Sequence, residues 1–192
     1  MKKVLFIILI SCFSLTIISC AKKSSTSSSS TTSSGLYVVG DNGTILTSTD
    51  GTTWDNSSSY DTPSRLRSVI YANSTFMTVG YTDEIILSSS DGITWDNKRS
   101  GTGNLRGVAY GNNKFVVVGL SGHISTSSDG TSWDNRTSGT STGLYGINYV
   151  NNQFVVVGQV GTILTSSDGI SWDNRTISGQ TIYLYHVAHG NN

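Results

Sequence analysis

One ten-residue stretch, TSSDGISWDN at 165–174, decides the fold because it occurs four times in the chain. The other copies are TSTDGTTWDN at 47–56, SSSDGITWDN at 88–97 and TSSDGTSWDN at 126–135. All four tryptophans lie in these copies, at spacings of 41, 38 and 39 residues. Self-similarity at such a period is typical of a repeat architecture, so we divide the chain into units of about 40 residues.

Two more blocks recur with the same period. One reads LYVVG at 36–40, FMTVG at 76–80, and FVVVG at both 115–119 and 154–158. The other begins with a leucine, as in LRGVAYGNN at 105–113, and its four copies start at Leu66, Leu105, Leu144 and Leu184. Each unit therefore predicts four short strands: the leucine block, the second block, a segment such as 162–166, and the segment around the tryptophan. Asn-Asn, Gly-containing and Asp-Gly turns separate them, and these residues tolerate the positive φ of tight turns.

Four short strands in every unit of about 40 residues are typical of a propeller blade. We therefore expect an all-β fold, a small β-propeller of four four-stranded blades over residues 35–192. The two ends are in phase, because LYHVAHGNN at 184–192 followed by GLYVVG at 35–40 would reproduce the pattern of 105–119. The C-terminal strand 184–189 is thus predicted to pair with the N-terminal strand and close the ring. A dimeric eight-bladed ring and a piece of a longer array are the alternatives.

The N-terminus has the features of an export signal. A short basic start precedes an apolar run, 4–18, that is short and interrupted for a membrane-spanning helix, and a cysteine follows soon after it. This junction resembles the lipobox of bacterial lipoproteins. The resemblance implies a signal peptide at 1–19, acyl chains on Cys20 and a Ser/Thr-rich tether over 20–34 that cannot bury apolar surface. Ala21, in place of an Asp, favours the outer membrane of the cell envelope. A cleaved signal with an incidental cysteine is the alternative.

The composition excludes several classes of protein. Charged residues make up 12% of the chain and the formal net charge is zero, so the basic stripe of a nucleic-acid-binding protein is missing. The two cysteines, Cys12 and Cys20, precede the repeats, and the three histidines lack metal-ligand spacing. We therefore expect no nucleic-acid partner, no structural metal and no cofactor.

The repeated Ser-x-Asp-Gly-x-Thr/Ser-Trp element resembles the Asp box, or bacterial neuraminidase repeat, of sialidase-like propellers. It is one residue shorter between Asp and Gly than the usual form. The resemblance covers 35–192 and implies a structural role in every blade. The aspartates are expected to accept hydrogen bonds from turn N–H groups, the glycines to supply positive φ, and the tryptophans to pack between blades. These residues are Asp50, Gly51, Trp54, Asp91, Gly92, Trp95, Asp129, Gly130, Trp133, Asp168, Gly169 and Trp172.

An active site should break the repeat symmetry. Sialidases use three arginines on the substrate carboxylate, a tyrosine paired with a glutamate, and an acidic aspartate. This chain has one glutamate, Glu84, and most of its six arginines recur at equivalent positions. No catalytic triad pattern is visible in the sequence. We therefore expect that the protein is not an enzyme, while a tyrosine–glutamate pair around Glu84 leaves a sialidase-like hydrolase open as the alternative.

Symmetry does break in the turns between the second and third strands and near the start of each leucine strand. In related propellers these turns share one face beside the channel mouth. The candidate ligand rim consists of Arg67, Tyr81, Asp83, Glu84, Arg106, His123, Tyr145 and Tyr185. Aromatic and arginine side chains are common anchors in recognition sites. We expect a non-enzymatic, envelope-anchored binding or scaffolding propeller that recognises a protein, peptide or glycan and attaches to the membrane through its lipid.

Overall fold

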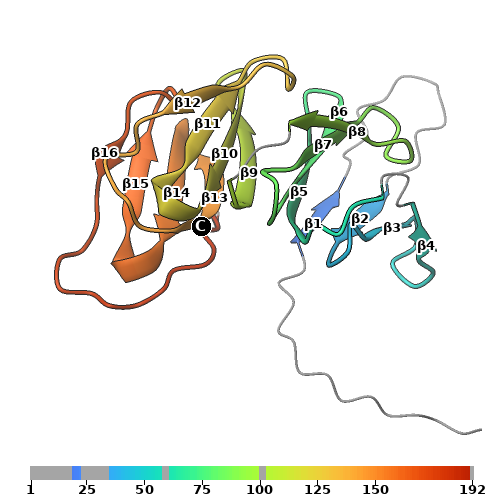
Figure 1. Ribbon diagram of the computed structural model, residues 1–192, viewed down its shortest axis with the longest axis horizontal. Coiled ribbons are helices and arrows are strands. Elements are labelled where there is room, and N and C mark those ends of the chain that lie inside the picture. Colours follow the sequence, from blue (N-terminus) through green and yellow to red (C-terminus); the bar gives the residue numbers. More distant parts are fainter. Residues whose placement is uncertain (1–18, 23–34, 58–60, 100–102, 191–192) are drawn as a thin grey trace, which may run out of the picture.

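The computed structural model describes residues 19–22, 35–57, 61–99 and 103–190, which form four antiparallel sheets of four strands (Figure 1). We call these sheets blades 1 to 4 in chain order. Blade 1 contains β1 (Ser19–Lys22), β2 (Leu36–Val39), β3 (Ile45–Ser48) and β4 (Asp55–Asn56), and blade 2 contains β5 (Leu66–Ala72), β6 (Thr75–Gly80), β7 (Ile86–Ser89) and β8 (Asp96–Arg99). Blade 3 contains β9 (Leu105–Gly111), β10 (Lys114–Gly119), β11 (Ile124–Ser127) and β12 (Asp134–Arg136), and blade 4 contains β13 (Leu144–Val150), β14 (Gln153–Gly158), β15 (Ile163–Ser166) and β16 (Asp173–Asn174). Two short 3-10 turns follow β10 and β14: η1 (Leu120–Gly122) and η2 (Gln159–Gly161). Consecutive strands pair in each blade, which confirms the all-β prediction and the four-strand unit.

The first strand of each blade lies innermost. Among these first strands, β1 contacts β5, β5 contacts β9, and β9 contacts β13. Figure 1 shows the remaining strands of each blade farther from this group of first strands. Two-residue turns join the first strand to the second in blades 2 to 4. Both residues have positive φ, as in Asn112 at 45° and Asn113 at 57°, and such turns match the twist of antiparallel strands. The Asn-rich motif therefore forms the tight turn that the sequence predicts.

An aromatic pair repeats in blades 2, 3 and 4. A tyrosine on the first strand lies directly opposite a phenylalanine on the second, as in Tyr110 and Phe115, whose ring centroids are 4.6 Å apart. Cross-strand pairs of this kind contribute roughly 0.2–1 kcal/mol each. The three phenylalanines are among the largest fully buried side chains: Phe76, Phe115 and Phe154. The pairs therefore help to fix the register that brings equivalent residues of successive blades to the same level.

The Asp-Gly turns have the predicted hydrogen bonds. The Asp91 carboxylate accepts the N–H groups of Ile93 and Thr94, both at 2.8 Å, and the Ser89 hydroxyl at 2.9 Å. The same backbone bonds recur at Asp50, Asp129 and Asp168. The four glycines of these turns have φ between 74° and 78°. Backbone hydrogen bonds from Thr94 and Ile93, with that from Ser89, lower the pKa of Asp91 to about 2.

The tryptophans are not equally buried, which corrects the expectation that every ring packs between blades. Trp95 is 3% exposed and belongs to a cluster shared by blades 1 and 2, whereas Trp54 is 38% exposed. The physical reason lies in how blades stack. The Asp-Gly turn of blade 2 packs against Tyr37 of blade 1, and among the described residues no blade precedes blade 1 to cover Trp54. The intermediate cases are Trp133 and Trp172.

The inner edge of blade 1 is held by β1, which pairs with β2 from Ser19 opposite Val39 to Lys22 opposite Leu36. Residues 184–189 form no sheet strand. They lie beside β13, where the Asn148 side-chain amide donates to the Val187 carbonyl at 3.4 Å. The Leu184 N–H donates to the carbonyl of Gly158, the last residue of β14, at 3.0 Å. One edge of a strand holds one antiparallel partner, and here residues 19–22 supply it. Closure of the ring by 184–189 is therefore not confirmed.

The predicted signal peptide and tether fall mostly outside the described residues. Of these segments the structure describes the backbone of 19–22, so Cys20 lies in β1 and its lipidation stays a prediction. Within the described ranges, no helix has the length and apolar character needed to cross a membrane.

Candidate functional site

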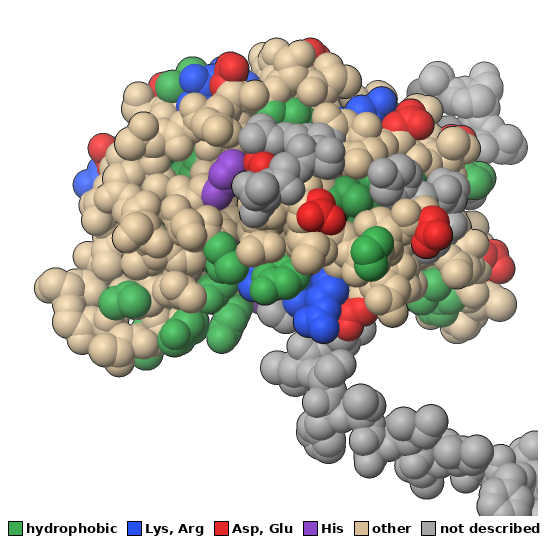
Figure 2. Space-filling model, viewed as in Figure 1, with side chains coloured by type: hydrophobic (Ala, Val, Ile, Leu, Met, Phe, Trp, Pro, Cys, Tyr) green, Lys and Arg blue, Asp and Glu red, His purple; other side chains and the backbone are tan. Residues whose placement is uncertain are grey.

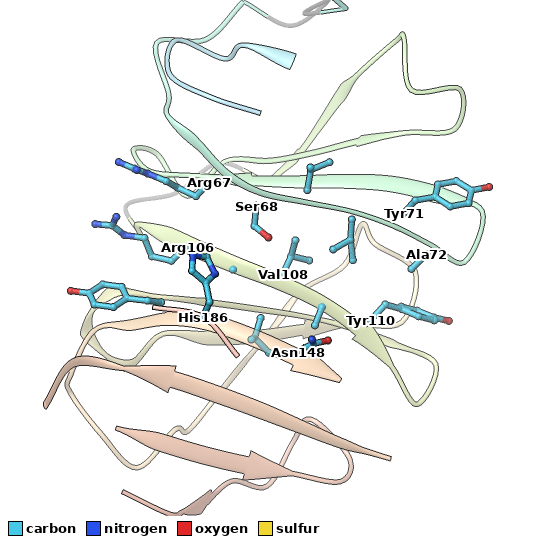
Figure 3. Close-up of a pocket in the computed structure, with 16 residues that line it drawn as sticks. Arg67, Ser68, Tyr71, Ala72, Arg106, Val108, Tyr110, Asn148 and His186 are labelled. Atoms are coloured by element: carbon cyan, nitrogen blue, oxygen red, sulfur yellow. The ribbon is translucent and has the colours of Figure 1, made fainter. Parts of the chain in front are cut away.

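Two adjoining cavities lie among the inner strands. The first has a volume of about 350 Å³ and is lined by β5, β9, β13 and His186. Figure 3 shows Arg67 and Arg106 at one end of this cavity and Tyr71 and Tyr110 at the other. The second, of about 240 Å³, lies at the arginine end and is lined by Arg67, Arg106, Tyr145, Tyr185 and His186. The polar end of the channel is therefore the candidate site.

The repeat explains why these side chains meet. Arg67, Arg106 and Tyr145 each follow the leucine that begins β5, β9 or β13, and Tyr185 follows Leu184 in the same way. Equivalent positions of a repeat lie at the same level of the channel. The structure thus places two arginines and two tyrosines around one mouth. Figure 2 shows Lys or Arg side chains next to hydrophobic ones at the lower edge of the molecule.

The arginines and tyrosines alternate in a stack, which we call the Arg/Tyr cluster: Arg67, Tyr81, Arg106, Tyr145 and Tyr185. The Arg106 guanidinium carbon lies 4.7 Å from the ring centroid of Tyr81 and 5.6 Å from that of Tyr145. Arg67 lies 5.7 Å from the Tyr81 ring. The Tyr145 and Tyr185 rings stack with centroids 5.3 Å apart and planes 18° apart. These cation–π contacts hold both guanidinium groups against tyrosine rings.

The two arginines of this cluster carry uncompensated charge. Neither takes part in an ion pair within the described residues, and the Nε atoms of both are buried without a hydrogen-bond partner there. Burial lowers the pKa of Arg106, and the neighbouring charge of Arg67 lowers it further, yet an arginine stays protonated at neutral pH. Buried donors without partners are rare in folded proteins. Two guanidinium groups without a described counter-ion beside a cavity suit the site to an anionic group.

Glu84 and His123 form a separate pair between blades 2 and 3. Glu84 Oε1 lies 3.1 Å from His123 Nε2, and the Ser125 hydroxyl lies 2.9 Å from the same ring nitrogen. A catalytic relay needs both nitrogens of the imidazole, one for each neighbour. Neither Glu84 nor His123 lines either cavity. This arrangement fits an inter-blade contact better than a catalytic site.

The structure thus divides the predicted rim. Five of its residues form the Arg/Tyr cluster, Glu84 and His123 pair elsewhere, and Asp83 is exposed in its turn. The rim predicted from the sequence did not include Tyr183, which stacks at 6.3 Å on Tyr185, or His186, which lines both cavities. The signal for His186 was its place in the repeat, where the other blades have Ser or Gly.

Comparisons with known proteins identify the fold. No protein-family model and no curated protein matches the chain. Among solved structures, YCF48 from Cyanidioschyzon merolae is 19% identical with a TM-score of 0.57 over 85% of this chain and 58% of its own. YCF48 bound to D1 peptide is 21% identical with a TM-score of 0.60, over 74% and 51%. The computationally designed Ika8 protein is 14% identical with a TM-score of 0.64, over 91% and 53%.

The chain therefore spans about half the length of the solved propellers that it matches. Identities this low show likeness of fold alone, and the four sheets around a common set of inner strands agree with that likeness. The described residues have the fold of a β-propeller.

Proposed function

We propose that this protein is a non-enzymatic binding propeller that holds an anionic group of a peptide, protein or glycan at the Arg/Tyr cluster. The observation that carries the proposal is the pair of buried Nε atoms, on Arg67 and Arg106, that lack partners within the described residues. A carboxylate offers two acceptor oxygens that match the N–H edge of a guanidinium. The tyrosine rings beside it supply rigid apolar surface of the kind common at recognition sites.

Recognition explains the site better than catalysis does. Among the described residues, no Asp or Glu lines either cavity. A sialidase-like hydrolase would need a glutamate next to a tyrosine of the site, and Glu84 instead contacts His123 between two blades. The solved YCF48 that is bound to D1 peptide is a propeller with a peptide ligand, which supports a peptide among the three ligand classes.

We further propose that the propeller acts at the bacterial cell envelope. The support is the lipobox-like junction at Cys20, which follows the apolar run 4–18. Acyl chains on this cysteine would hold the chain at the membrane durably, because several chains anchor far better than one. The anchor and the ligand site are independent parts of this proposal.

Binding of defined anionic probes tests the ligand site. The full chain, purified in detergent, is titrated with pentaglutamate and with trigalacturonic acid, and the uncharged pentaglutamine and maltotriose serve as ligand controls. We expect at least one anionic probe to bind, with affinity that falls as salt rises. The variant R67Q/R106Q should lose at least tenfold in affinity, whereas R175Q, which alters an exposed arginine paired with Asp173, should not. Equal affinity in both variants, or no binding by either anionic probe, would refute the proposal.

A further inference from the structure

The outer face of blade 1 lacks the cover that the other blades have. The glycine of each Asp-Gly turn in blades 2 to 4 contacts one residue of the preceding blade: Gly92 meets Tyr37, Gly130 meets Met77 and Gly169 meets Val116. The equivalent glycine of blade 1 is Gly51, and within the described ranges a Cβ placed on it would meet Leu36 of its own blade and no residue of another blade. The exposure of Trp54 belongs to the same uncovered surface.

Blade 4 has the complementary open surface. In blades 1, 2 and 3 the residue that contacts the Asp-Gly turn of the following blade is buried. These residues are Tyr37, Met77 and Val116. Their equivalent in blade 4, Val155, is only half-buried. One end of the described structure therefore presents a turn without a receiving surface, and the other end presents a receiving surface without a turn.

The inner strands show the same mismatch. In β5 and β9 the first residue, a leucine, and the fourth, a valine, are both buried. Leu184 and Val187, at the equivalent positions, are half-buried. Residues 184–189 already make a first-strand contact with blade 4, because the Leu184 N–H bonds to Gly158 just as the Leu66 N–H bonds to Gly40. In the part of the chain that the structure describes, no strand pairs with residues 184–189 on their other side.

In blade 1 the second strand, β2, pairs with a first strand that does not match those of the other blades. Its neighbour β1 has four residues, Ser-Cys-Ala-Lys, whereas β5, β9 and β13 have seven each. None of those four residues supplies the buried leucine or valine of an inner strand. The sequence 184–189 does supply both, in the spacing of the repeat.

We propose that two copies of this chain complete one propeller, each placing its residues 184–189 beside β2 of the other in exchange for β1. The exchange would cover Trp54 of one copy with the Val155 surface of its partner. It makes two identical contacts related by a twofold axis, which is the commonest form of closed assembly. This proposal does not depend on the ligand proposed above.

A second copy is favoured over closure within one chain by the likeness of the four blades to parts of larger propellers. The chain follows about half of the three larger propellers, up to a TM-score of 0.64. A ring of four blades must turn twice as far at each blade as a ring of eight. Four blades with the curvature of a larger ring leave their two ends apart, and a second half-ring joins both.

Disulfide formation across the proposed strand pair tests the exchange. Val108 faces Val117 in blade 3, and the same register places Val187 of one copy opposite Val38 of the other. Full chains in which Cys12 and Cys20 are replaced by Ser carry either Val38→Cys or Val187→Cys, and the two are co-expressed with different affinity tags. Oxidation should give a mixed dimer at twice the 20.5 kDa of one chain. Its amount should be at least tenfold above that from Val38→Cys with Ile93→Cys, a control at an exposed position.

Two results would overturn the inference. A single chain carrying both cysteines could form the disulfide at the mass of a monomer, which would show closure within one chain. The cysteines could also stay reduced in a protein that light scattering shows to be monomeric, which would show that β1 keeps its place. Light scattering on the cysteine-free chain gives the mass without relying on either substitution.

Discussion

Replacing Trp95 by Ala should lower the free energy of unfolding by about 3–5 kcal/mol, the usual cost of removing a buried aromatic side chain. The ring is 3% exposed and packs in the cluster that blades 1 and 2 share, with Phe76 at 6.3 Å. Its equivalent in blade 1, Trp54, is 38% exposed. Because solvent already reaches that ring, Trp54→Ala should cost only about 1–2 kcal/mol in the single chain. The two positions share one motif, so each variant is the matched control of the other.

Urea unfolding followed by circular dichroism measures both costs without relying on tryptophan fluorescence. At the lowest protein concentration the two variants should differ by about 1–4 kcal/mol. If a second copy covers Trp54, the cost of Trp54→Ala should rise with protein concentration while that of Trp95→Ala stays constant. Equal costs at every concentration would refute the reasoning, because they would show that Trp54 is as well packed as Trp95 in the single chain.

Three further predictions concern single residues. The pKa of Asp91 lies at about 2, below its ordinary value, so the stability that its carboxylate contributes is full above pH 4 and disappears as pH falls toward 2. The difference in Tm between the protein and Asp91→Asn should therefore shrink over that range. A constant difference would contradict the hydrogen bonds described. Glu84→Gln should lower the free energy of unfolding by about 1–2 kcal/mol, because it removes the charge that faces His123. Neither the unaltered protein nor this variant should hydrolyse sialosides. Turnover by the unaltered protein that Glu84→Gln abolishes would instead support the hydrolase. Cys20→Ser should move the protein from the membrane fraction to the soluble fraction and abolish labelling by a fatty-acid analogue, and retained label would exclude lipidation at this cysteine.

The structural features that recur in every repeat could be predicted from the sequence. A block that occurs four times reports the average environment of its residues, so the hydrogen bonds of Asp91 and its equivalents, the Asn112–Asn113 turn and the order of strands could all be predicted. The position after each leucine also accounts for the way in which Arg67 and Arg106, on neighbouring inner strands, line the same cavity.

What the sequence could not provide is the environment at the ends of the repeat. Trp54 has the same neighbours in sequence as Trp95, and its exposure depends on a blade that the described residues do not supply. The pairing of β1 with β2 could not be predicted either, because Ser19–Lys22 has no resemblance to an inner strand and owes its place to a vacant edge. Glu84 was predicted to belong to the rim because it lies in the turn between the second and third strands of its blade. In the structure its backbone has a φ of 48°, and its side chain contacts His123 of the next blade.

The most direct test of the ligand site is to observe the two Nε–H groups themselves. In nitrogen–proton correlation spectra of the full chain in detergent, titration with an anionic probe should shift the Nε–H signals of Arg67 and Arg106 in proportion to occupancy. The exposed Arg175, paired with Asp173, should keep its signal unchanged. Shifts confined to Arg175, or equal at all three arginines, would contradict the account, because they would show non-specific attraction of anions in place of a built site.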